Sequence, residues 1–240
     1  MKTIHAAAIA ATLGATLAGA VQAADLNQLQ NLRTQGAFKD LTEDLGALLS
    51  YKSLSPATPL GVTGFDVGVD ASVTRMNSDA FKTAAGTSRS TIPLARLRAQ
   101  KGLPFGFDVG ASYAQVPTTD IRLWGGELRY AIAEGGLIAP AVAVRGSFSR
   151  LDGVSQLGFN TRAIDASISK GVLGVTPYGG VGRVWATGTP KGVAGLSQET
   201  VGLNKLFAGV NFGLGIFATG VEYDRTGGAD TISAKLALRW

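Results

Sequence analysis

The sequence predicts an all-β fold, a ten-stranded antiparallel transmembrane β-barrel preceded by a short N-terminal helical segment. Three observations support this prediction. Apolar and polar residues alternate with a period of two from Gly61 to Trp240, as in strands with one apolar face. Beyond a short leader, the chain has no apolar run of the about 18 residues that a membrane-spanning helix needs. Finally, the connections between the predicted strands alternate in length, which is typical of membrane barrels.

The composition narrows the possible chemistry. The chain of 240 residues contains 33 Gly, no Cys and one His, and only 16% of its residues are charged. With 45% hydrophobic residues, it is not a disordered protein. The lack of Cys excludes disulfide scaffolds, Cys-ligated metals and thiol nucleophiles. The net charge is +5, but the sequence contains no block of five Lys or Arg residues, so we expect no nucleic-acid partner.

Residues 1–23 are predicted to be a secretory signal peptide. Lys2 is followed by an uncharged run from Ala6 to Val21, and small residues precede a cleavage site between Ala23 and Ala24. The run is shorter than the about 20 residues of a membrane-anchor helix. Cleavage removes Lys2 and His5, so 22 basic residues become 21 against 17 acidic ones and no imidazole remains.

Residues 24–60 are predicted to be a helical segment with a Pro-rich linker. A helical period links the apolar residues Leu26, Leu29, Leu32, Phe38, Leu41, Leu45, Leu48 and Leu49. The sequence SLSPATP at 53–59 ends this pattern. From the sequence, residues 25–50 either enter the barrel or lie at its periplasmic mouth.

Residues 61–240 are predicted to be the barrel. The expected strands cover about 61–75, 92–101, 104–116, 122–134, 138–150, 160–170, 174–187, 202–213, 216–226 and 230–240. Most have the length of about 9–11 residues that a tilted strand needs to cross a bilayer. The connections after odd-numbered strands, 76–91, 117–121, 151–159, 188–201 and 227–229, are mostly longer than those after even-numbered strands, 102–103, 135–137, 171–173 and 214–215. Because short turns of such barrels face the periplasm, both barrel termini should lie there.

Several aromatic residues share the apolar face of the predicted strands, which predicts aromatic girdles at the two membrane interfaces. The alternative is the general preference of aromatic residues for strands. They are Phe105, Tyr130, Phe148, Tyr178, Phe212, Phe217, Tyr223 and Trp240.

The C-terminal strand adds a resemblance. Ile232, Ala234, Leu236, Leu238 and Trp240 share one face of the last strand. This pattern resembles the terminal signal of Gram-negative outer-membrane proteins, which usually ends in Phe and is recognised by the barrel assembly machinery. The resemblance implies a bacterial outer-membrane location. The entry sequence LGVTGFD at 60–66 is also similar to an uncharacterised family of outer-membrane barrels with a short helical N-terminus, which implies no activity.

Charged residues within the strands should point into the lumen, because an Arg or Lys in the lipid costs about 2–4 kcal/mol at the bilayer midplane. The predicted lumen charges are Asp66, Asp70, Arg96, Arg98, Asp108, Glu127, Arg129, Arg145, Asp165, Arg183, Lys205, Glu222, Asp224, Lys235 and Arg239. The expected turn lengths place four pairs opposite each other: Lys205 and Asp224, Glu222 and Lys235, Glu127 and Arg145, and Arg98 and Asp108. Barrel closure should bring Lys235 and Arg239 near Asp66 and Asp70.

Two roles remain open for this lumen. Charge pairs that fill it would make a closed, structural or surface-interaction barrel, whereas an accessible lumen would pass or bind small or apolar solutes. We expect a non-enzymatic protein with no cofactor, metal site or catalytic residue. A hydrolase without His is the less favoured alternative, because the carboxylate pairs Asp66 with Asp70 and Glu222 with Asp224 already have basic partners. Expected partners are outer-membrane lipid and lipopolysaccharide, with Arg89, Arg150, Lys191 and Arg225 near the loops; the oligomeric state is unknown.

Overall fold

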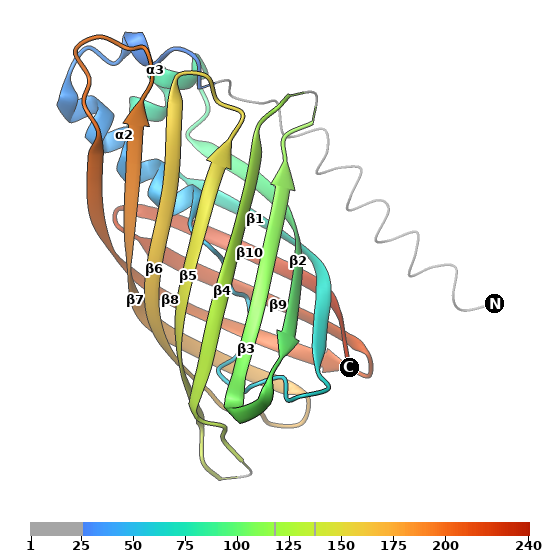
Figure 1. The fold of residues 1–240 in the computed structure, drawn as a ribbon. Helices are drawn as coiled ribbons and strands as arrows, with labels where there is room; N and C mark the ends of the chain where they lie inside the picture. Colours follow the sequence, from blue (N-terminus) through green and yellow to red (C-terminus); the bar gives the residue numbers. More distant parts are fainter. Residues whose placement is uncertain (1–25, 118, 137) are drawn as a thin grey trace.

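The computed structural model describes residues 26–240 except Thr118 and Leu137 (Figure 1), so the predicted signal peptide and its cleavage site lie outside the described residues. The described residues form ten antiparallel strands that close into a barrel, with the last strand hydrogen-bonded to the first. The strands are β1 (Phe65–Arg75), β2 (Thr91–Gly102), β3 (Phe107–Gln115), β4 (Arg122–Ala133), β5 (Ala141–Asp152), β6 (Leu157–Ser169), β7 (Val175–Pro190), β8 (Glu199–Leu214), β9 (Phe217–Thr226) and β10 (Ala229–Arg239). The predicted fold class is therefore confirmed.

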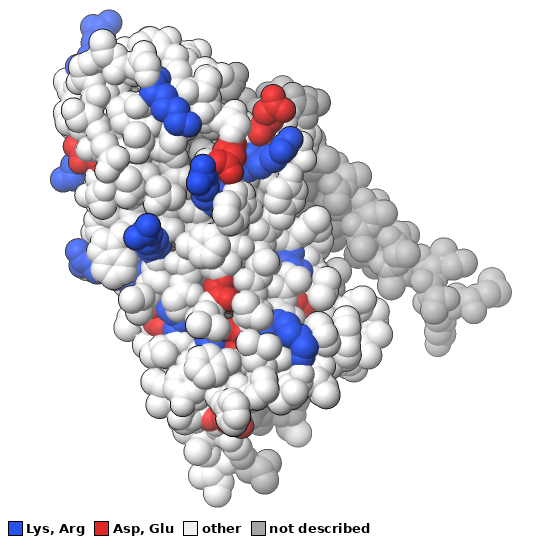
Figure 2. All heavy atoms as spheres, viewed as in Figure 1, with Lys and Arg blue, Asp and Glu red and all other residues white. Residues whose placement is uncertain are grey.

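The wall of the barrel presents apolar side chains outward. Val69, Leu97, Ile164 and Leu206 are each about half exposed or more. Closure leaves no free sheet edge, so the backbone groups of every strand are paired within the wall. The uncharged surface that results is visible over most of the face in Figure 2. Among the described residues, no helix has the length and apolar character needed to span a membrane.

Most strand bounds differ from the sequence prediction by a few residues, and one tight turn changes the position of a predicted aromatic residue. Residues Pro104–Gly106 form a 3-10 turn, η2, and β3 begins only at Phe107. Phe105 has a φ of 63° in this turn and is 89% exposed, so it is not part of the strand face on which it was predicted. Pro104 lacks an N–H for the ladder and fixes its own φ, which favours a turn over a continued strand.

The alternation of connection lengths is weaker than the sequence indicated. The connections after β1 and β7 are long, covering 76–90 and 191–198, but the one after β4 covers 134–140 and is longer than the one at 153–156 after β5. We call the end with the 76–90 and 191–198 connections the long-connection end and the opposite one the short-connection end.

The N-terminal segment begins at the long-connection end. A short 3-10 helix, η1 (Leu29–Asn31), precedes α2 (Gln35–Leu49), which Thr34 caps by accepting a hydrogen bond from the Ala37 N–H. The backbone of Gln28 bonds to Ala84 of α3 (Ala80–Ala85), a short helix in the connection after β1. The helical prediction for this segment is confirmed as a 3-10 turn followed by one longer helix.

Helix α2 lies inside the barrel (Figure 1). It contacts strands from both sides of the closed wall, including β5, β7, β8 and β10. Phe38, Leu41 and Leu45 are fully buried against inward residues such as Val184 and Leu203. An apolar core therefore fills the long-connection half of the lumen, as in a water-soluble domain.

Gly46 sets the distance between α2 and the wall. A Cβ atom at this position would lie 2.8 Å from the Ala186 Cβ and 2.9 Å from the Leu203 Cδ1. At Gly36 of the same helix, a Cβ would meet only the Thr34 Oγ1, at 3.9 Å. The packing against β7 and β8 thus requires a residue without a side chain at Gly46.

Gly46→Ala should lower the stability of the folded barrel, whereas Gly36→Ala should leave it unchanged or raise it. Helix propensity alone favours Ala over Gly by about 0.5–1 kcal/mol at both positions, so opposite signs would isolate the packing at Gly46. Urea unfolding in detergent measures both. Stabilisation by Gly46→Ala would show that α2 does not pack this closely against the wall.

Candidate functional site

Most predicted lumen charges lie inside the barrel. Those that are buried there are Asp66, Asp70, Arg96, Arg98, Asp108, Glu127, Arg129, Arg145, Asp165, Lys205, Glu222, Asp224 and Lys235. Arg239 is partly exposed at the short-connection end. They occupy the half of the lumen that the apolar core leaves open.

The inward and outward positions of β7 are exchanged relative to the prediction. Arg183 is exposed on the outer wall, and Tyr178, predicted for an aromatic girdle, is buried in the lumen, where its hydroxyl donates to Glu222 at 2.9 Å. The inward residues of β7 include Ala186 and Gly188, and a Cβ at Gly188 would lie 2.7 Å from the Thr42 Oγ1 of α2. Helix α2 thus requires small residues at the inward positions of β7 that it contacts, Ala186 and Gly188.

The outer face keeps aromatic residues at both ends of the strands. Tyr130, Phe148, Phe212, Phe217, Tyr223 and Trp240 of the predicted set are outward and exposed, as are Tyr113, Trp124 and Trp185, which were not in that set. The terminal residues Ile232, Leu236, Leu238 and Trp240 are also exposed on the outer side of β10.

Barrel closure brings Asp66 to two bases. Asp66 is directly opposite Arg239, and its carboxylate lies 2.6 Å from Arg239 Nη2 and 3.1 Å from Lys235 Nζ. The expected proximity of Lys235 and Arg239 to Asp66 is present in the structure. Asp70 is directly opposite Lys235 on β10, but its ion pair is with Arg96 on β2, at 3.0 Å.

Two further ion pairs join residues directly opposite each other in neighbouring strands. Asp108 of β3 pairs with Arg129 of β4 at 2.7 Å, and Arg145 of β5 pairs with Asp165 of β6 at 2.7 Å. Arg145 also lies 3.6 Å from Glu127. Such direct pairs stabilise an antiparallel ladder and fix its register.

None of the four pairs predicted from turn lengths consists of residues that lie directly opposite each other in the sheet. Asp224 is opposite Phe207, Glu222 is opposite Ser233, Glu127 is opposite Ser147 and Asp108 is opposite Gly102. Each register differs because strand ends and turns are not where the sequence placed them. The Glu127 and Arg145 pair survives only as a diagonal contact.

An extended segment, residues 50–60, runs through the charged half of the lumen toward β1. It has no helix or strand, and lumen side chains satisfy many of its backbone groups. Around its first half, Arg96 donates to the Ser50 carbonyl at 3.3 Å and Asn211 to the Leu54 carbonyl at 3.3 Å. The side chains that bind this segment come from strands all around the barrel, so the segment occupies the lumen.

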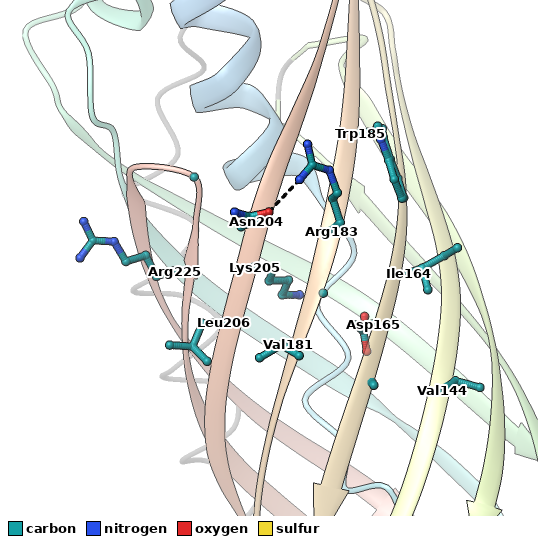
Figure 3. Close-up of a pocket in the computed structure, with 13 residues that line it drawn as sticks. Val144, Ile164, Asp165, Val181, Arg183, Trp185, Asn204, Lys205, Leu206 and Arg225 are labelled. Carbon is teal, nitrogen blue, oxygen red and sulfur yellow. Dashed lines mark hydrogen bonds between the residues drawn. The ribbon is translucent and has the colours of Figure 1, made fainter.

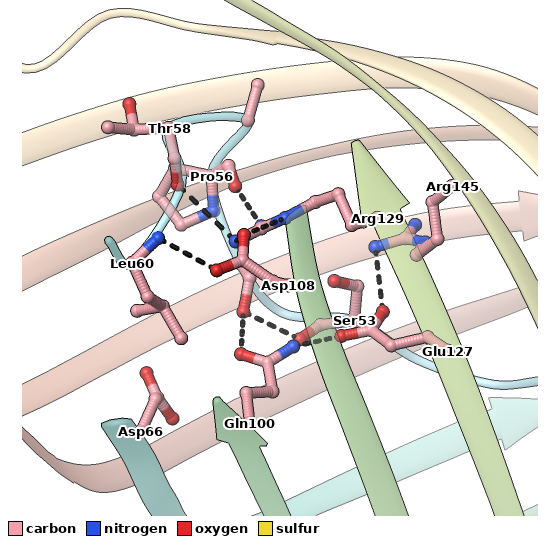
Figure 4. Close-up of polar contacts among 12 residues, drawn as sticks. Ser53, Pro56, Thr58, Leu60, Asp66, Gln100, Asp108, Glu127, Arg129 and Arg145 are labelled. Atoms are coloured by element: carbon pink, nitrogen blue, oxygen red, sulfur yellow. Dashed lines mark hydrogen bonds and ion pairs between the residues drawn. The ribbon is translucent and has the colours of Figure 1, made fainter. Parts of the chain in front are cut away.

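One ion pair makes three of the hydrogen bonds to the backbone of the second half of this segment (Figure 4), and Ser169 accepts a further one from the Ala57 N–H. Arg129 donates to the Pro56 and Thr58 carbonyls while it binds Asp108. Asp108 also accepts the Leu60 N–H at 3.0 Å. A single pair in the wall therefore fixes three backbone groups of the lumen segment.

Lys52 is the lumen charge that the sequence prediction missed. Its Nζ lies 2.8 Å from Asp224 of β9, and both side chains have no exposed surface. Nζ also donates to the Ala47 carbonyl near the end of α2, at 3.0 Å. Lys52 lies in a linker, and the only sequence signal was an isolated base directly after an apolar helix.

Asp44 ties α2 to the long-connection end. Its carboxylate accepts hydrogen bonds from the N–H groups of Asn77 and Ser78 at 2.9 and 3.1 Å and from the Ser78 hydroxyl at 2.6 Å. Burial raises the pKa of Asp44, and these hydrogen bonds oppose the shift. Asp44 thus joins α2 to the β1–β2 connection that lies over it.

The lumen carboxylates are held by bases or hydroxyls. Asp66, Asp70 and Asp224 have the ion pairs described above, and Glu222 accepts from Tyr178. Over residues 26–240 with the two gaps noted, no group of three or more His, Asp or Glu is placed to hold a metal ion. The arrangement binds a segment of its own chain.

Comparisons with known proteins give similarity of fold. Protein-family models and curated proteins yield no match. Among solved structures, the N-terminal β-barrel domain of Pseudomonas aeruginosa OprF is 13% identical with a TM-score of 0.39, covering 75% of this chain and 99% of that chain. The KdgM porin is 9% identical with a TM-score of 0.36, covering 72% and 98%. The translocator domain of the autotransporter NalP from Neisseria meningitidis is 10% identical with a TM-score of 0.38, covering 85% and 96%.

The chain has the fold of a transmembrane β-barrel. Its own structure has the properties of that class: an even number of antiparallel strands, a closed wall, outward apolar and aromatic residues, and polar residues inside.

Lys52→Met should destabilise the barrel strongly, by about 3–5 kcal/mol, because it leaves the buried Asp224 without its closest base. Adding Asp224→Asn should restore most of the loss, since the unpaired charge is then gone. Unfolding in urea measures both variants.

Lys82→Met is the matched control, because Lys82 pairs with Asp79 on the surface and such pairs contribute about 0–1 kcal/mol. Equal effects of Lys52→Met and Lys82→Met would contradict the assignment of Lys52 to a sealed lumen.

Proposed function

We propose that this protein is an outer-membrane barrel with a closed lumen, which acts through its surface at the long-connection end. The observation that carries the proposal is the occupied lumen. Helix α2 and residues 50–60 cross the barrel from one end to the other, and their contacts with the wall are buried. No reaction is assigned, because the candidate carboxylates are engaged in structural contacts.

The membrane location is supported by the outer wall. Exposed Val, Leu and Ile side chains such as Val69, Leu128 and Leu236 cover it between the aromatic residues at the strand ends. A water-soluble barrel would expose a large apolar surface at a high cost in free energy, whereas lipid solvates the same surface.

The closed lumen is supported by the partners of the segment that fills it. To leave, residues 50–60 would have to break the Lys52 ion pair with Asp224 and the bonds from Arg96 and Arg129, and α2 would have to expose its apolar face. Passage of solutes through the lumen would require this removal. The geometry therefore favours the structural and surface role over the transport role.

Wild-type protein in planar lipid bilayers should give no discrete conductance steps. Deletion of residues 26–60 should produce conductance steps. The lumen of the ten-stranded barrel would then contain only the charged side chains of the wall and water, through which ions can pass. If the deletion variant does not fold, Gly46→Trp in the full chain serves as the second variant, since its indole displaces α2 from Ala186 and Leu203.

The outcome against this proposal is equally concrete. Discrete steps in the wild-type protein that change with Glu127→Ala would show an open, charge-lined pathway, and the transport role would then replace the closed lumen.

The proposal also determines which residues lie on the extracellular side of the membrane. The N-terminal segment lies with the long connections: Leu29 N–H donates to Gln156 at 3.0 Å, and the Gln35 side chain bonds to Ser197 and Glu199. In membrane barrels the longer loops are extracellular. Residues 26–35 therefore contribute to the outer surface, although β1 starts at the opposite end.

Cysteine labelling on intact cells tests this orientation, and the natural lack of Cys makes it clean. A membrane-impermeant maleimide should label Asn31→Cys in intact cells, whereas Ile138→Cys, 94% exposed at the short-connection end, should react only after lysis. The reverse pattern would mean that the long-connection end faces the periplasm.

A further inference from the structure

The outer wall over β6 to β9 carries exposed arginines where lipid is expected. Arg162, Arg183 and Arg225 all point outward. Arg162 is directly opposite both Phe148 and Trp185, so it lies within a row of aromatic residues toward the long-connection end. Such rows mark the membrane interface, where an outward base costs little free energy because it can reach polar headgroups.

The same region of the wall is hollowed. A groove of about 750 Å³ is lined by Arg183, Arg225 and the apolar side chains of Val144, Val181 and Leu206 (Figure 3). A second hollow of about 700 Å³ contains Arg162 and shares Ile164 and Trp185 with the first. We call these two hollows together the arginine groove; it combines bases toward the long-connection end with an apolar floor.

Arg183 is held in position within the arginine groove. Its Nη1 donates to the Asn204 Oδ1 at 2.9 Å. Its guanidinium lies over Gly202, where a Cβ would come within 2.7 Å of Nη2. The missing side chain at Gly202 therefore makes room for the guanidinium on the outer wall.

The positive charge of the arginine groove exceeds its negative charge. Lys205 and Asp165 of the lumen also line the first hollow, and Asp165 is paired with Arg145. Arg225 lies 3.9 Å from Asp230 in an exposed pair. Within the described part of the chain, no salt bridge joins Arg162 or Arg183 to a carboxylate, in contrast to Arg150, which pairs with Asp152 at 2.9 Å. A ligand that complements this site carries a negative charge next to an apolar portion.

We propose that the arginine groove binds a phosphorylated lipid of the outer leaflet. The phosphate lies against Arg183, which is flanked by Arg225 in the same hollow and by Arg162 in the neighbouring one, since the planar guanidinium matches phosphate oxygens with paired hydrogen bonds. The acyl chains lie along Val144, Val181 and Leu206. This inference goes beyond the closed lumen and rests on the proposed membrane location; a binding assay in detergent tests it separately from conductance.

The experiment measures binding of diphosphorylated lipid A to the folded protein in detergent micelles by native mass spectrometry. The variant with Arg162→Gln, Arg183→Gln and Arg225→Gln should bind at least tenfold less lipid A than wild type. The matched control replaces three other outward arginines, Arg75, Arg122 and Arg150, by Gln and should change binding less than twofold. Because all six side chains are exposed, both variants should keep the barrel circular dichroism spectrum.

A second variant keeps the charge and changes only the shape. Gly202→Leu displaces the Arg183 guanidinium and should also reduce binding of lipid A several-fold. Inorganic phosphate at millimolar concentration should not displace the lipid. Unchanged binding in the groove variant, an equal loss in the control variant, or displacement by inorganic phosphate would each overturn the proposal.

Discussion

The structure depends on partners for the polar groups sealed inside the barrel, many of which the wall and the lumen segment supply to each other. Residues 50–60 have no helix or strand to pair their backbone, and the wall supplies the missing donors and acceptors from Arg96, Arg129 and Asp108. In turn, the segment supplies Lys52, the base that forms the ion pair with the buried Asp224. The charges of the wall and the polar groups of the segment thus compensate for each other's loss of hydration.

The lumen is divided into two halves that solve this problem differently. Toward the long-connection end, α2 buries Phe38, Leu41 and Leu45 against apolar inward residues, and the buried Asp44 is held by hydrogen bonds from residues 77 and 78. Toward the short-connection end, ion pairs between neighbouring strands hold an extended segment. The N-terminal segment therefore joins a conventional apolar core to a polar network within one wall.

The occupied lumen also affects the outside. Because α2 approaches within contact distance of β7, the inward positions that face this helix, such as Ala186 and Gly188, carry small residues. Arg183 of the same strand lies on the outer face, where it lines the arginine groove. The packing of α2 and one part of the arginine groove therefore lie on opposite faces of β7.

The class of fold and the alternation of most strands could be predicted from the sequence, because a wall with hydrocarbon on one side and polar groups on the other imposes a period of two on every strand. The sequence also located most lumen charges, Asp66 and Arg129 among them, since burial of a charge in lipid is costly. Only the tertiary structure decided which charges pair, because a shift of a turn by two residues, as between Asp108 and Arg98, changes every partner in a ladder. The structure alone placed α2 and residues 50–60 inside the barrel, because a helical period indicates that one face is buried but not which surface covers it. It alone also showed the facing of β7.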